Sequence, residues 1–296
     1  MNAAANLISV CIPAFQQPEP VLRAVNSVLD QKSCDFEIVI SDDTEDRSVE
    51  TALRPYLSDS RVRYFKNSVR LGAVPNWNAS IRHAAGRVIK ILHHDDWLCG
   101  DTSLATLAKP VLDGEAPFVF CGCRQMSVTG DELSVHRITA TQLAELKTSP
   151  ECLVFGNFIG APSVCAFDAK IGCAEFDPNY TWLADAEFYI RFLNTAGNRF
   201  VYCNDALVNV TTDSPAQISR FYESNRLSAV LENVRLFSSR NDSSHDRKRV
   251  VKHFRQMGFG LSAREIAIAT CAAIDDNGYR MALTLAGGYL RKVVGL

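Results

Sequence analysis

Two pairs of aspartates in this sequence each come directly after a short apolar run. The first pair is Asp42 and Asp43 after residues 36–40, and the second is Asp95 and Asp96 after residues 87–92. Both runs are short and rich in β-branched residues, which is typical of buried strands. Ligands of open α/β sheets bind at the carboxyl ends of parallel strands, so we expect both pairs to line one negatively charged cleft. Such a cleft suits a divalent cation and sugar-nucleotide hydroxyls better than a bare anion.

A plainer interpretation exists for each pair taken alone. Aspartates after a strand commonly mark a turn or the N-cap of a helix. Residues 43–46 fit that pattern, with a helix expected to begin near Arg47. Two pairs that follow the same kind of strand are harder to explain as unrelated turns, so the sequence favours a functional site.

The composition is that of a folded, nearly neutral protein. The 296 residues are 47% apolar and 22% charged, and the formal net charge is -2. These values predict a packed core and argue against a nucleic-acid partner that depends on overall positive charge. The ten cysteines form no zinc frame, because Cys121 and Cys123 are too close for the usual knuckle and no second knuckle follows. We expect reduced thiols and a reducing compartment.

The beginning of the chain carries no targeting pattern. Residues 1–6 contain no basic residue, and Pro13 interrupts the apolar stretch that follows, so a signal peptide is not expected. No apolar run approaches the roughly 20 residues that span a bilayer. The expected location is cytoplasmic, with peripheral contact to the inner face of the membrane as an option.

Strands and helices alternate over the first hundred residues. Strands are predicted at 7–14, 36–40, 61–65 and in a run ending at Asp95 and Asp96, and helices at 18–31, 47–57 and 76–85. This order implies right-handed crossovers and a mostly parallel central sheet flanked by helices, an α/β fold. Further along, the pattern predicts helices at 103–112 and 182–193, strands at 117–121, 164–167 and within 199–210, and a loop-rich stretch at 124–150.

The chain divides into a catalytic domain and a tail. We expect a catalytic domain over residues 1–220, with a nucleotide-binding half at about 7–100 and an acceptor half at about 101–220, and a helical C-terminal extension over 221–296. Within the extension, residues 247–255 are strongly basic and residues 281–296 place apolar side chains at helical spacing. Both segments could lie on an anionic membrane, although a solvated face and a core or homodimer stripe explain them more simply.

Five short segments resemble the inverting glycosyltransferases of family 2. They are residues 9–15, the acidic turn at 41–46, Leu71-Gly72 with residues 76–78, the DXD-type motif at 94–96, and Asp185 within 184–188. The likeness covers about residues 7–220 and implies a GT-A type nucleotide-diphospho-sugar transferase fold. It implies transfer of a sugar from a nucleotide-diphosphate donor of UDP, dTDP or GDP type to a glycan or lipid-linked acceptor, as in bacterial surface polysaccharide synthesis.

The resemblance assigns donor contacts around the first acidic pair. Nucleotide contacts are expected from Pro13, Ala14, Phe15, Asp43, Arg70, Asn78 and Asp95. Asp43 would contact the base or ribose, and Phe15 would cover the base. From the residues alone, Phe15 could equally be core and Arg70 a solvated loop charge.

The second pair would hold a divalent cation, Mn or Mg, which neutralises the leaving diphosphate. Asp96 is the expected direct ligand, and Asp95 would contact the ribose or reach the metal through water. Many relatives carry a histidine about where this chain has Asp213, so the third protein contact to the metal stays open. His93 and His94 are left out of the ligand set, because adjacent residues at a strand end point to opposite sides.

Asp185 is the expected general base. In an inverting transfer a base takes the proton of the acceptor hydroxyl as that oxygen attacks the anomeric carbon. Apolar neighbours could raise the proton affinity of Asp185; a helix N-cap explains the same residue about equally well, and the resemblance favours the base. Contacts to the acceptor or donor sugar are expected from Trp97, Gly160, Pro162, Ser163 and Trp182.

Two other classes of protein fit parts of the sequence. A catalytically silent sugar-nucleotide-binding or scaffold protein would explain the absence of the histidine at position 213, although the aspartates at 43, 95, 96 and 185 are all present. A nucleotidyltransferase would want a glycine-rich basic loop after the first strand, and residues 13–20 contain no Gly, Arg or Lys. The glycosyltransferase therefore remains the favoured interpretation.

Overall fold

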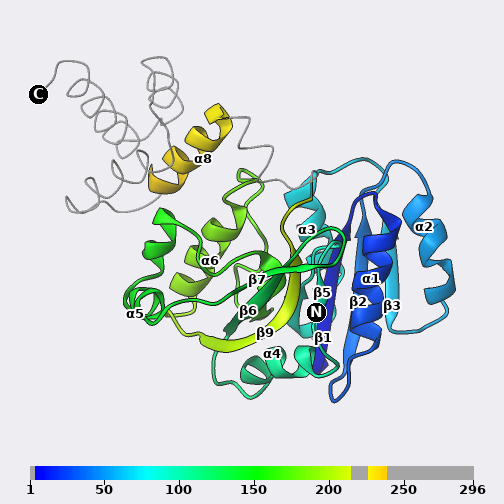
Figure 1. Cartoon of the computed structure of the whole chain (residues 1–296), viewed down its shortest axis with the longest axis horizontal. Helices are drawn as coiled ribbons and strands as arrows, with labels where there is room; N and C mark the ends of the chain where they lie inside the picture. The colour runs from blue at the N-terminus through cyan, green and yellow to red at the C-terminus, as the bar shows by residue number, and fades with distance from the viewer. Residues whose placement is uncertain (1–3, 215–225, 239–296) are drawn as a thin grey trace, which may run out of the picture.

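The computed structural model of the chain describes residues 4–214 and 226–238. In this part the chain forms one curled sheet flanked by helices (Figure 1). The basic stretch at 247–255 and the apolar spacing at 281–296 lie outside the described residues. Among the residues that are described, no helix combines the length and the apolar character needed to cross a bilayer.

The first half of the sheet is parallel. It consists of β1 (Ala4–Ala14), β2 (Phe36–Asp42), β3 (Val62–Lys66) and β4 (Gly86–Ile91). The strands lie in the order β3-β2-β1-β4, and each strand runs parallel to its neighbours. Every residue of β2 is buried, as its apolar run predicts. The carboxyl ends of β1, β2 and β4 therefore meet at one edge of the sheet.

Three helices connect these strands: α1 (Pro18–Leu29), α2 (Ser48–Leu53) and α3 (Ala73–His83). Pro18 and Pro20 open α1, where the N–H that proline lacks would have no helical partner. The helix α2 is shorter than the expected 47–57, because Pro55 cannot continue it and the chain turns into the 3-10 helix η1 (Arg54–Tyr56). The helix α3 begins before the expected residue 76, directly after Gly72. Gly72 has a φ of 86°, which glycine adopts readily and other residues rarely do.

The second half of the sheet is mixed. It adds β5 (Trp97–Leu98), β6 (Phe118–Met126), β7 (Glu132–His136), β8 (Cys165–Asp168) and β9 (Val201–Thr211). Here β6 and β9 are parallel, whereas β4 with β8, β6 with β8, β6 with β7 and β5 with β9 are antiparallel. The expectation of a mostly parallel sheet therefore holds for the first half only, because β8 inserts antiparallel between β4 and β6.

The stretch at 124–150 is more ordered than the predicted loop. It contains the end of β6, the strand β7 and the helix α5 (Ala140–Thr148). The residues of β7 are mostly exposed because the strand pairs only with β6, off the main path of the sheet, so its sequence shows no apolar face. The helix α5 begins at a capping box made by Thr139 and Gln142.

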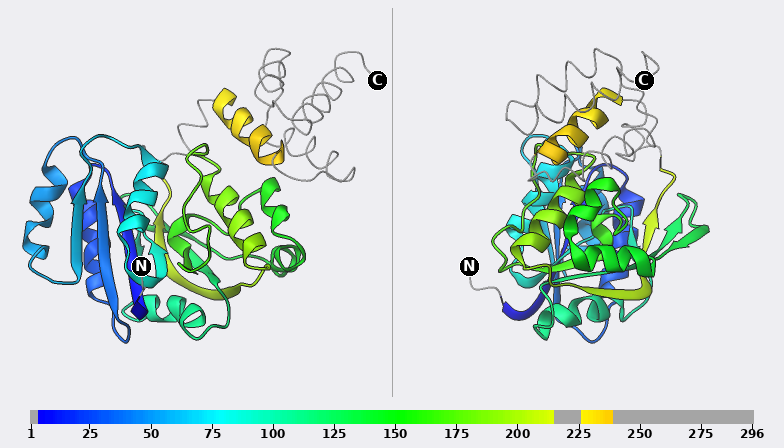
Figure 2. Two further views of the ribbon diagram at one scale, coloured as in Figure 1. Left: turned by 180° about the vertical axis from the view of Figure 1, so that it is seen from behind. Right: turned by 90° about the vertical axis from the view of Figure 1, so that its left-hand side faces the viewer.

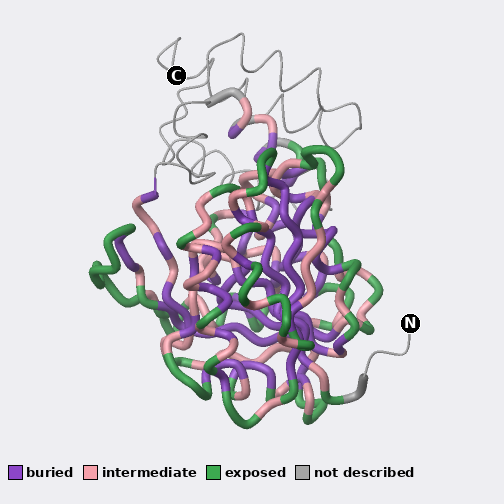
Figure 3. Tube along the Cα trace, turned by 90° about the vertical axis from the view of Figure 1, so that its right-hand side faces the viewer, coloured by how far each residue is buried: buried purple, intermediate pink, exposed green. Residues whose placement is uncertain are grey.

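An aromatic cluster joins the second half of the sheet to the helix α6 (Ala184–Thr195). Phe118 of β6 packs on Tyr189 and Phe192 of α6 with ring centroids 5.6 Å apart in both pairs, and Phe167 of β8 packs on Phe188 at 5.0 Å. All five side chains are essentially inaccessible. Figure 3 shows the buried residues concentrated along the central strands. This packing fixes α6, and with it the carboxylate near its start, relative to the sheet.

The edge of the sheet opposite the carboxyl ends is also tightly constrained. Glu37 accepts hydrogen bonds from the Ser9 hydroxyl at 2.6 Å and from Arg63 at 2.7 Å. The Ser9 hydroxyl in turn accepts the backbone N–H of Gly86 at 2.8 Å. A Cβ at Gly86 would lie 2.6 Å from the carbonyl oxygen of Leu7, so no larger residue fits where β4 begins.

The helix α8 (Arg226–Ser238) packs on the second half of the chain (Figures 1 and 2). Phe237 contacts Phe155 of the 3-10 helix η2 (Pro150–Phe155), with ring centroids 5.7 Å apart. Arg235 donates to the carbonyl of Asn179 and lies over the ring of Tyr180. The first described helix beyond residue 220 thus contacts the predicted acceptor half directly; the division of the chain at 220 stays a prediction.

Candidate active site

The second acidic pair lies in a turn after β4. The strand ends at Ile91, earlier than predicted, and Asp96 N–H donates to the carbonyl of His93 at 2.9 Å to close the turn. Asp96 itself is 2% exposed. Its carboxylate accepts the N–H of Thr211 at 2.9 Å and a hydrogen bond from the Ser163 hydroxyl. Burial and the nearby Asp95 raise the pKa of Asp96 well above its usual value, and a divalent cation beside it would oppose that shift.

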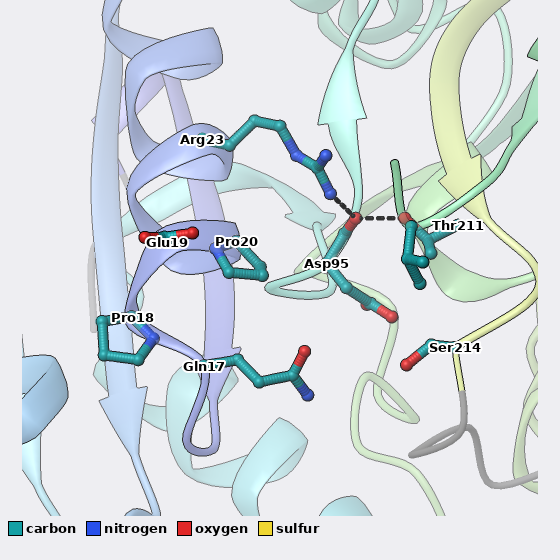
Figure 4. Close-up of a pocket in the computed structure, with 9 residues that line it drawn as sticks. Gln17, Pro18, Glu19, Pro20, Arg23, Asp95, Thr211 and Ser214 are labelled. Carbon is teal, nitrogen blue, oxygen red and sulfur yellow. Dashed lines mark hydrogen bonds between the residues drawn. The ribbon is translucent and has the colours of Figure 1, made fainter. Parts of the chain in front are cut away.

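Asp95 is held by its backbone, which leaves its carboxylate directed into a pocket (Figure 4). Its carbonyl oxygen accepts hydrogen bonds from the Thr211 hydroxyl at 2.6 Å and from Arg23 of α1 at 2.9 Å. The Arg23 guanidinium lies 3.7 Å from the centre of the Trp97 ring. One face of Trp97 is therefore covered by Arg23, and the predicted sugar contact of Trp97 is not supported on that face.

The pocket has a volume of about 540 Å³. It lies between the start of α1, the acidic turn and the end of β9, and is lined by Gln17, Pro18, Glu19, Pro20, Arg23, Asp95, Val128, Thr211 and Ser214. Gln16 and Gln17 both have φ above 50°, a conformation that costs free energy for residues other than glycine and that clusters at functional sites. The amide of Gln17 points into the same space as the Asp95 carboxylate (Figure 4).

The first acidic pair organises the loop after β3. Asp43 is 4% exposed, and its carboxylate accepts the side-chain amide of Asn67 at 3.0 Å and the backbone N–H groups of Leu71 at 2.7 Å and Gly72 at 2.9 Å. Three of its roughly four acceptor positions are thus used within the chain. A nucleotide contact of Asp43 would have to use the remaining one.

Phe15 and Arg70 come together at this loop. The Arg70 guanidinium lies 4.7 Å from the centre of the Phe15 ring and 3.8 Å from the carboxylate of Glu45. Phe15 keeps part of its surface accessible, unlike a core residue. A planar nucleotide base could stack on an accessible aromatic ring or on a guanidinium group, so this arrangement suits base binding.

Three other predicted donor contacts are buried in the chain. Pro13 and Ala14 are buried, and the carbonyl of Ala14 accepts the N–H of Asp43 at 2.9 Å. The prediction for Asn78 is not supported. Its side chain is 4% exposed, and it donates to the carbonyl of Phe176 at 2.7 Å and accepts the N–H of the same residue at 2.8 Å.

A buried lysine lies beneath the acidic turn. Lys90 of β4 is inaccessible, and it donates to the carbonyl of Ile91 at 2.9 Å and to that of Ser163. Burial lowers the pKa of Lys90 to about 8. Ser163 lies in the 3-10 helix η3 (Pro162–Val164) and its hydroxyl accepts the N–H of His93 at 2.9 Å. Lys90 thus joins η3 to the strand that carries the acidic turn.

The prediction that Pro162 and Ser163 contact a sugar is not supported. Both residues are buried, and the Ser163 hydroxyl is engaged by the acidic turn, as described above. Gly160 is partly accessible, but its carbonyl accepts hydrogen bonds from Asn157 at 3.0 Å and from the Tyr189 hydroxyl at 3.1 Å. The segment therefore supports the site and does not line it.

Asp185 occupies the first turn of α6, and the N-cap is Leu183. The N-cap interpretation of Asp185 is therefore wrong. One carboxylate oxygen accepts the N–H of Ala186 at 2.7 Å, and the other accepts the side-chain amide of Asn157 at 2.7 Å. Burial is the main cause that raises the pKa of Asp185 to about 6. A carboxylate with this pKa is ionised near neutral pH and is a stronger base than an exposed one.

Asn157 is a site residue that the sequence reasoning missed. Its side-chain oxygen accepts the N–H groups of Ile159 at 3.1 Å and Gly160 at 3.2 Å, while its amide holds Asp185. Nothing in the sequence ties Asn157 to a carboxylate 28 residues away. Residues 157–163 thus link the two sites, because Asn157 bonds to Asp185 and Ser163 bonds to Asp96.

Asn157→Asp is expected to raise the pH at which Asp185 ionises, and with it any activity that needs the ionised form. The substitution replaces a hydrogen-bond donor to Asp185 by a second carboxylate, and a like charge at this distance raises the pKa of the pair. The acidic limb of the pH profile of kcat should therefore move upward from about 6. A profile identical to that of the wild type, measured on folded protein, would rule out the pairing.

A divalent cation fits the acidic turn. In the described part of the chain, His, Cys, Asp and Glu form no group of three or more that could hold a metal by themselves. Mn²⁺ or Mg²⁺ in transferases is commonly held by one or two carboxylates together with substrate phosphates, which Asp96 and Asp95 can supply. Asp213 accepts the N–H of Val128 at 2.7 Å, so one of its oxygens is already engaged.

Comparisons with known proteins identify the family of this chain. A family model described as Glycosyl transferase family 2 matches residues 9–165, more than half of the chain. An uncharacterized protein of Mycobacterium tuberculosis is 28% identical over 68% of this chain and 66% of its own length. The abequosyltransferase RfbV of Salmonella typhimurium is 33% identical over 51% of this chain and 44% of its own length. The chain thus spans less than two thirds of the length of these relatives.

Solved structures share the fold. Staphylococcus aureus TarS 1–349 in complex with UDP-GlcNAc has a TM-score of 0.69 at 14% identity, covering 97% of this chain and 92% of that chain. The mannosyltransferase PcManGT from Pyrobaculum calidifontis, in complex with GDP-Man and Mn²⁺, has a TM-score of 0.57 at 13% identity, covering 97% and 87%. The fold is therefore of the GT-A type. With the family match and the site described above, the chain belongs to glycosyl transferase family 2.

Proposed function

We propose that this glycosyltransferase is metal-dependent and inverting, and that it moves one sugar from a nucleoside-diphosphate donor to a glycan or lipid-linked acceptor. The observation that carries the proposal is the link through residues 157–163. This one segment bonds to Asp185, a carboxylate with a pKa of about 6, and to Asp96, a buried carboxylate in a turn suited to a cation. A base and a cation site in fixed relation are what such a transfer requires.

The donor half would bind the nucleotide at the carboxyl ends of β1, β2 and β4. Phe15 and Arg70 offer a stacking surface for the base, and Asp43 holds the loop that carries Arg70. Asp95 would contact the ribose, or the cation through water. The cation, bound by Asp96 and the donor, would neutralise the charge that develops on the leaving diphosphate.

Asp185 would act on the acceptor. The acceptor oxygen forms a bond to the anomeric carbon while the bond from that carbon to the diphosphate oxygen breaks. Asp185 takes the proton of the acceptor hydroxyl, and the nucleoside diphosphate leaves with the bonding electrons. Attack opposite the leaving group inverts the anomeric configuration.

The acceptor class is supported by relatives. A curated protein of Campylobacter jejuni, 30% identical over 39% of this chain, is named as a glucosyltransferase acting on an undecaprenol-linked glycan. A second relative, WfgD of Escherichia coli, is 28% identical over 31% of this chain and is also named for a diphosphoundecaprenol acceptor. We propose a comparable acceptor here, with the enzyme in the cytoplasm and in peripheral contact with the inner face of the membrane.

The function is tested by a thermal-shift titration with UDP, dTDP and GDP, each with and without Mn²⁺. A ligand that binds the folded state raises the melting temperature by mass action, and a concentration of 100 times Kd adds about 2.7 kcal/mol. Stabilisation by one diphosphate that requires the metal identifies the donor base, and transfer from its sugar form is then measured directly. A folded protein that none of the three stabilises would overturn the proposal and favour a scaffold role.

A further inference from the structure

Residues 181–183 lead directly into α6. The N-cap residue Leu183 makes no side-chain hydrogen bond to the helix, yet Asp185 lies two residues further on. Within the first turn of the helix, the N–H of Ala186 is accepted by Asp185 itself. The N–H groups of residues 181–183 come before that turn, and as backbone donors they also need acceptors. For residues 181–183 the acceptor is a carboxylate from a different part of the sequence.

Glu232 of α8 supplies that carboxylate. One of its oxygens accepts the N–H of Thr181 at 3.1 Å, and the other accepts those of Trp182 and Leu183, both at 2.9 Å. Glu232 is 7% exposed. Three consecutive N–H groups converge on one buried carboxylate, which requires precise geometry. The donor and acceptor residues lie about 50 positions apart in the sequence.

We propose that Glu232 is a positioning residue for the transfer reaction: by binding the N–H groups of residues 181–183 it holds Asp185 in register with the acceptor. This inference rests on the proposed role of Asp185 as the base. Glu232 also fixes the position of Trp182, which is predicted to contact the acceptor or donor sugar, because its carboxylate binds the backbone N–H of that residue. The first described helix of the predicted C-terminal extension then belongs to the catalytic unit.

Glu232 also acts on Asp185 through its charge. Among residues 4–214 and 226–238, the charged or titratable groups that face Asp185 are Glu232 from α8, Cys165 from β8 and Tyr189 from α6 itself. The negative charge of Glu232 disfavours ionisation of Asp185 and contributes to its raised pKa, after the larger effect of burial. Removal of that charge lowers the pKa of Asp185, so the acidic limb of the activity profile moves to lower pH.

The test compares Glu232→Gln, Glu232→Asp and a matched control on the same helix, Arg235→Gln. Arg235 contacts Asn179 and Tyr180 but none of the three N–H groups that Glu232 binds. The readouts are kcat, KM for the donor, the pH profile of kcat, and hydrogen–deuterium exchange of the amides of residues 181–183.

For Glu232→Gln we expect faster amide exchange at residues 181–183 and a kcat lower by about tenfold or more, because the base is displaced. The KM for the donor should stay unchanged, and the acidic limb of the pH profile of kcat should move to lower pH. Glu232→Asp keeps the charge, so its limb stays in place and its kcat is intermediate. Arg235→Gln should keep the slow amide exchange of residues 181–183 and the wild-type position of the acidic limb in the pH profile of kcat.

Two results would overturn the inference. In the first, Glu232→Gln retains wild-type exchange, kcat and pH profile. In the second, Glu232→Gln and Arg235→Gln lose the same activity with no shift of the limb, which would mean that only the docking of α8 matters. The exchange measurement needs no substrate, so a protein without transferase activity that still loses protection in Glu232→Gln would refute the proposed function and not the contact.

Discussion

The Asp185→Asn variant should lose transfer activity, with kcat reduced by about 10²- to 10⁴-fold, the range typical of a general base. The substitution keeps the size of the side chain and one acceptor oxygen, but the amide cannot take a proton from the acceptor hydroxyl. The KM for the donor should change little, because Asp185 lies on α6 and the expected nucleotide contacts lie at the ends of β1, β2 and β4. Steady-state kinetics on both substrates measure this difference.

The pH dependence gives an independent check on the same residue. The wild type should gain activity as pH rises through about 6, since the pKa of Asp185 is raised to that value and only the ionised form is a base. The limb should be absent from the residual activity of Asp185→Asn. A variant that turns over at the wild-type rate while folded would show that another group is the base.

The pH dependence of stability should also change in Asp185→Asn. The pKa of Asp185 is higher in the folded chain than in the unfolded one, so its favourable contribution is complete below the unfolded value and is lost as pH rises through about 6. The variant cannot ionise, so this pH dependence of the melting temperature should be lost. Its amide group also replaces one of the two oxygens that accept hydrogen bonds from Ala186 and Asn157, which lowers the stability at every pH. A cooperative unfolding transition well above the assay temperature would exclude misfolding as the cause of lost activity.

The second large effect is expected at Asp96. Asp96→Asn should abolish the Mn²⁺-dependent part of the stabilisation by the donor nucleotide and lower kcat by about a hundredfold or more, the scale of a lost electrostatic contact to the transition state. The amide still has an oxygen to accept the N–H of Thr211, whose bond to Asp96 is 2.9 Å, so the turn should keep its shape. Thermal shift with and without Mn²⁺ measures the first effect and transfer kinetics the second.

A matched control for Asp96 is Asp101→Asn. Asp101 is an exposed carboxylate that pairs with Lys32 at 2.8 Å on the surface, and surface pairs of this kind contribute little to stability. Its variant should keep both the metal-dependent shift and the activity. If Asp96→Asn behaves like Asp101→Asn, the cation is bound elsewhere or is not required.

The family, the fold type and the main carboxylates could be predicted from the sequence because local patterns encode them. A β-branched run followed by acidic residues specifies a strand and what lies at its end, and this identified Asp43, Asp95 and Asp96. The mixed second half of the sheet was out of reach, because the antiparallel insertion of β8 depends on pairing between segments far apart in the chain. Likewise, the exposed strand β7 has no apolar face to reveal it.

The supporting residues of the site could not be predicted for a related reason. Asn157 and Glu232 act on α6 from other elements, and neither belongs to a pattern of local spacing. Ser163 was singled out for contact with a sugar, whereas its hydroxyl is used inside the protein by the acidic turn. Arg23 lies among apolar residues of a helix in the sequence, and its contact with Trp97 arises only in the folded chain.

The close approach at Gly86 has a consequence for inherited variation in this chain. The position lies at the end of β4 remote from the acidic turn, yet any side chain there would collide with the backbone of β1. Relief of that collision would slide β4 along β1, and the aspartates at its other end would travel with it. We therefore expect some loss-of-function alleles at the sheet edge farthest from the substrate. A substitution at Gly86 is expected to give a temperature-sensitive phenotype.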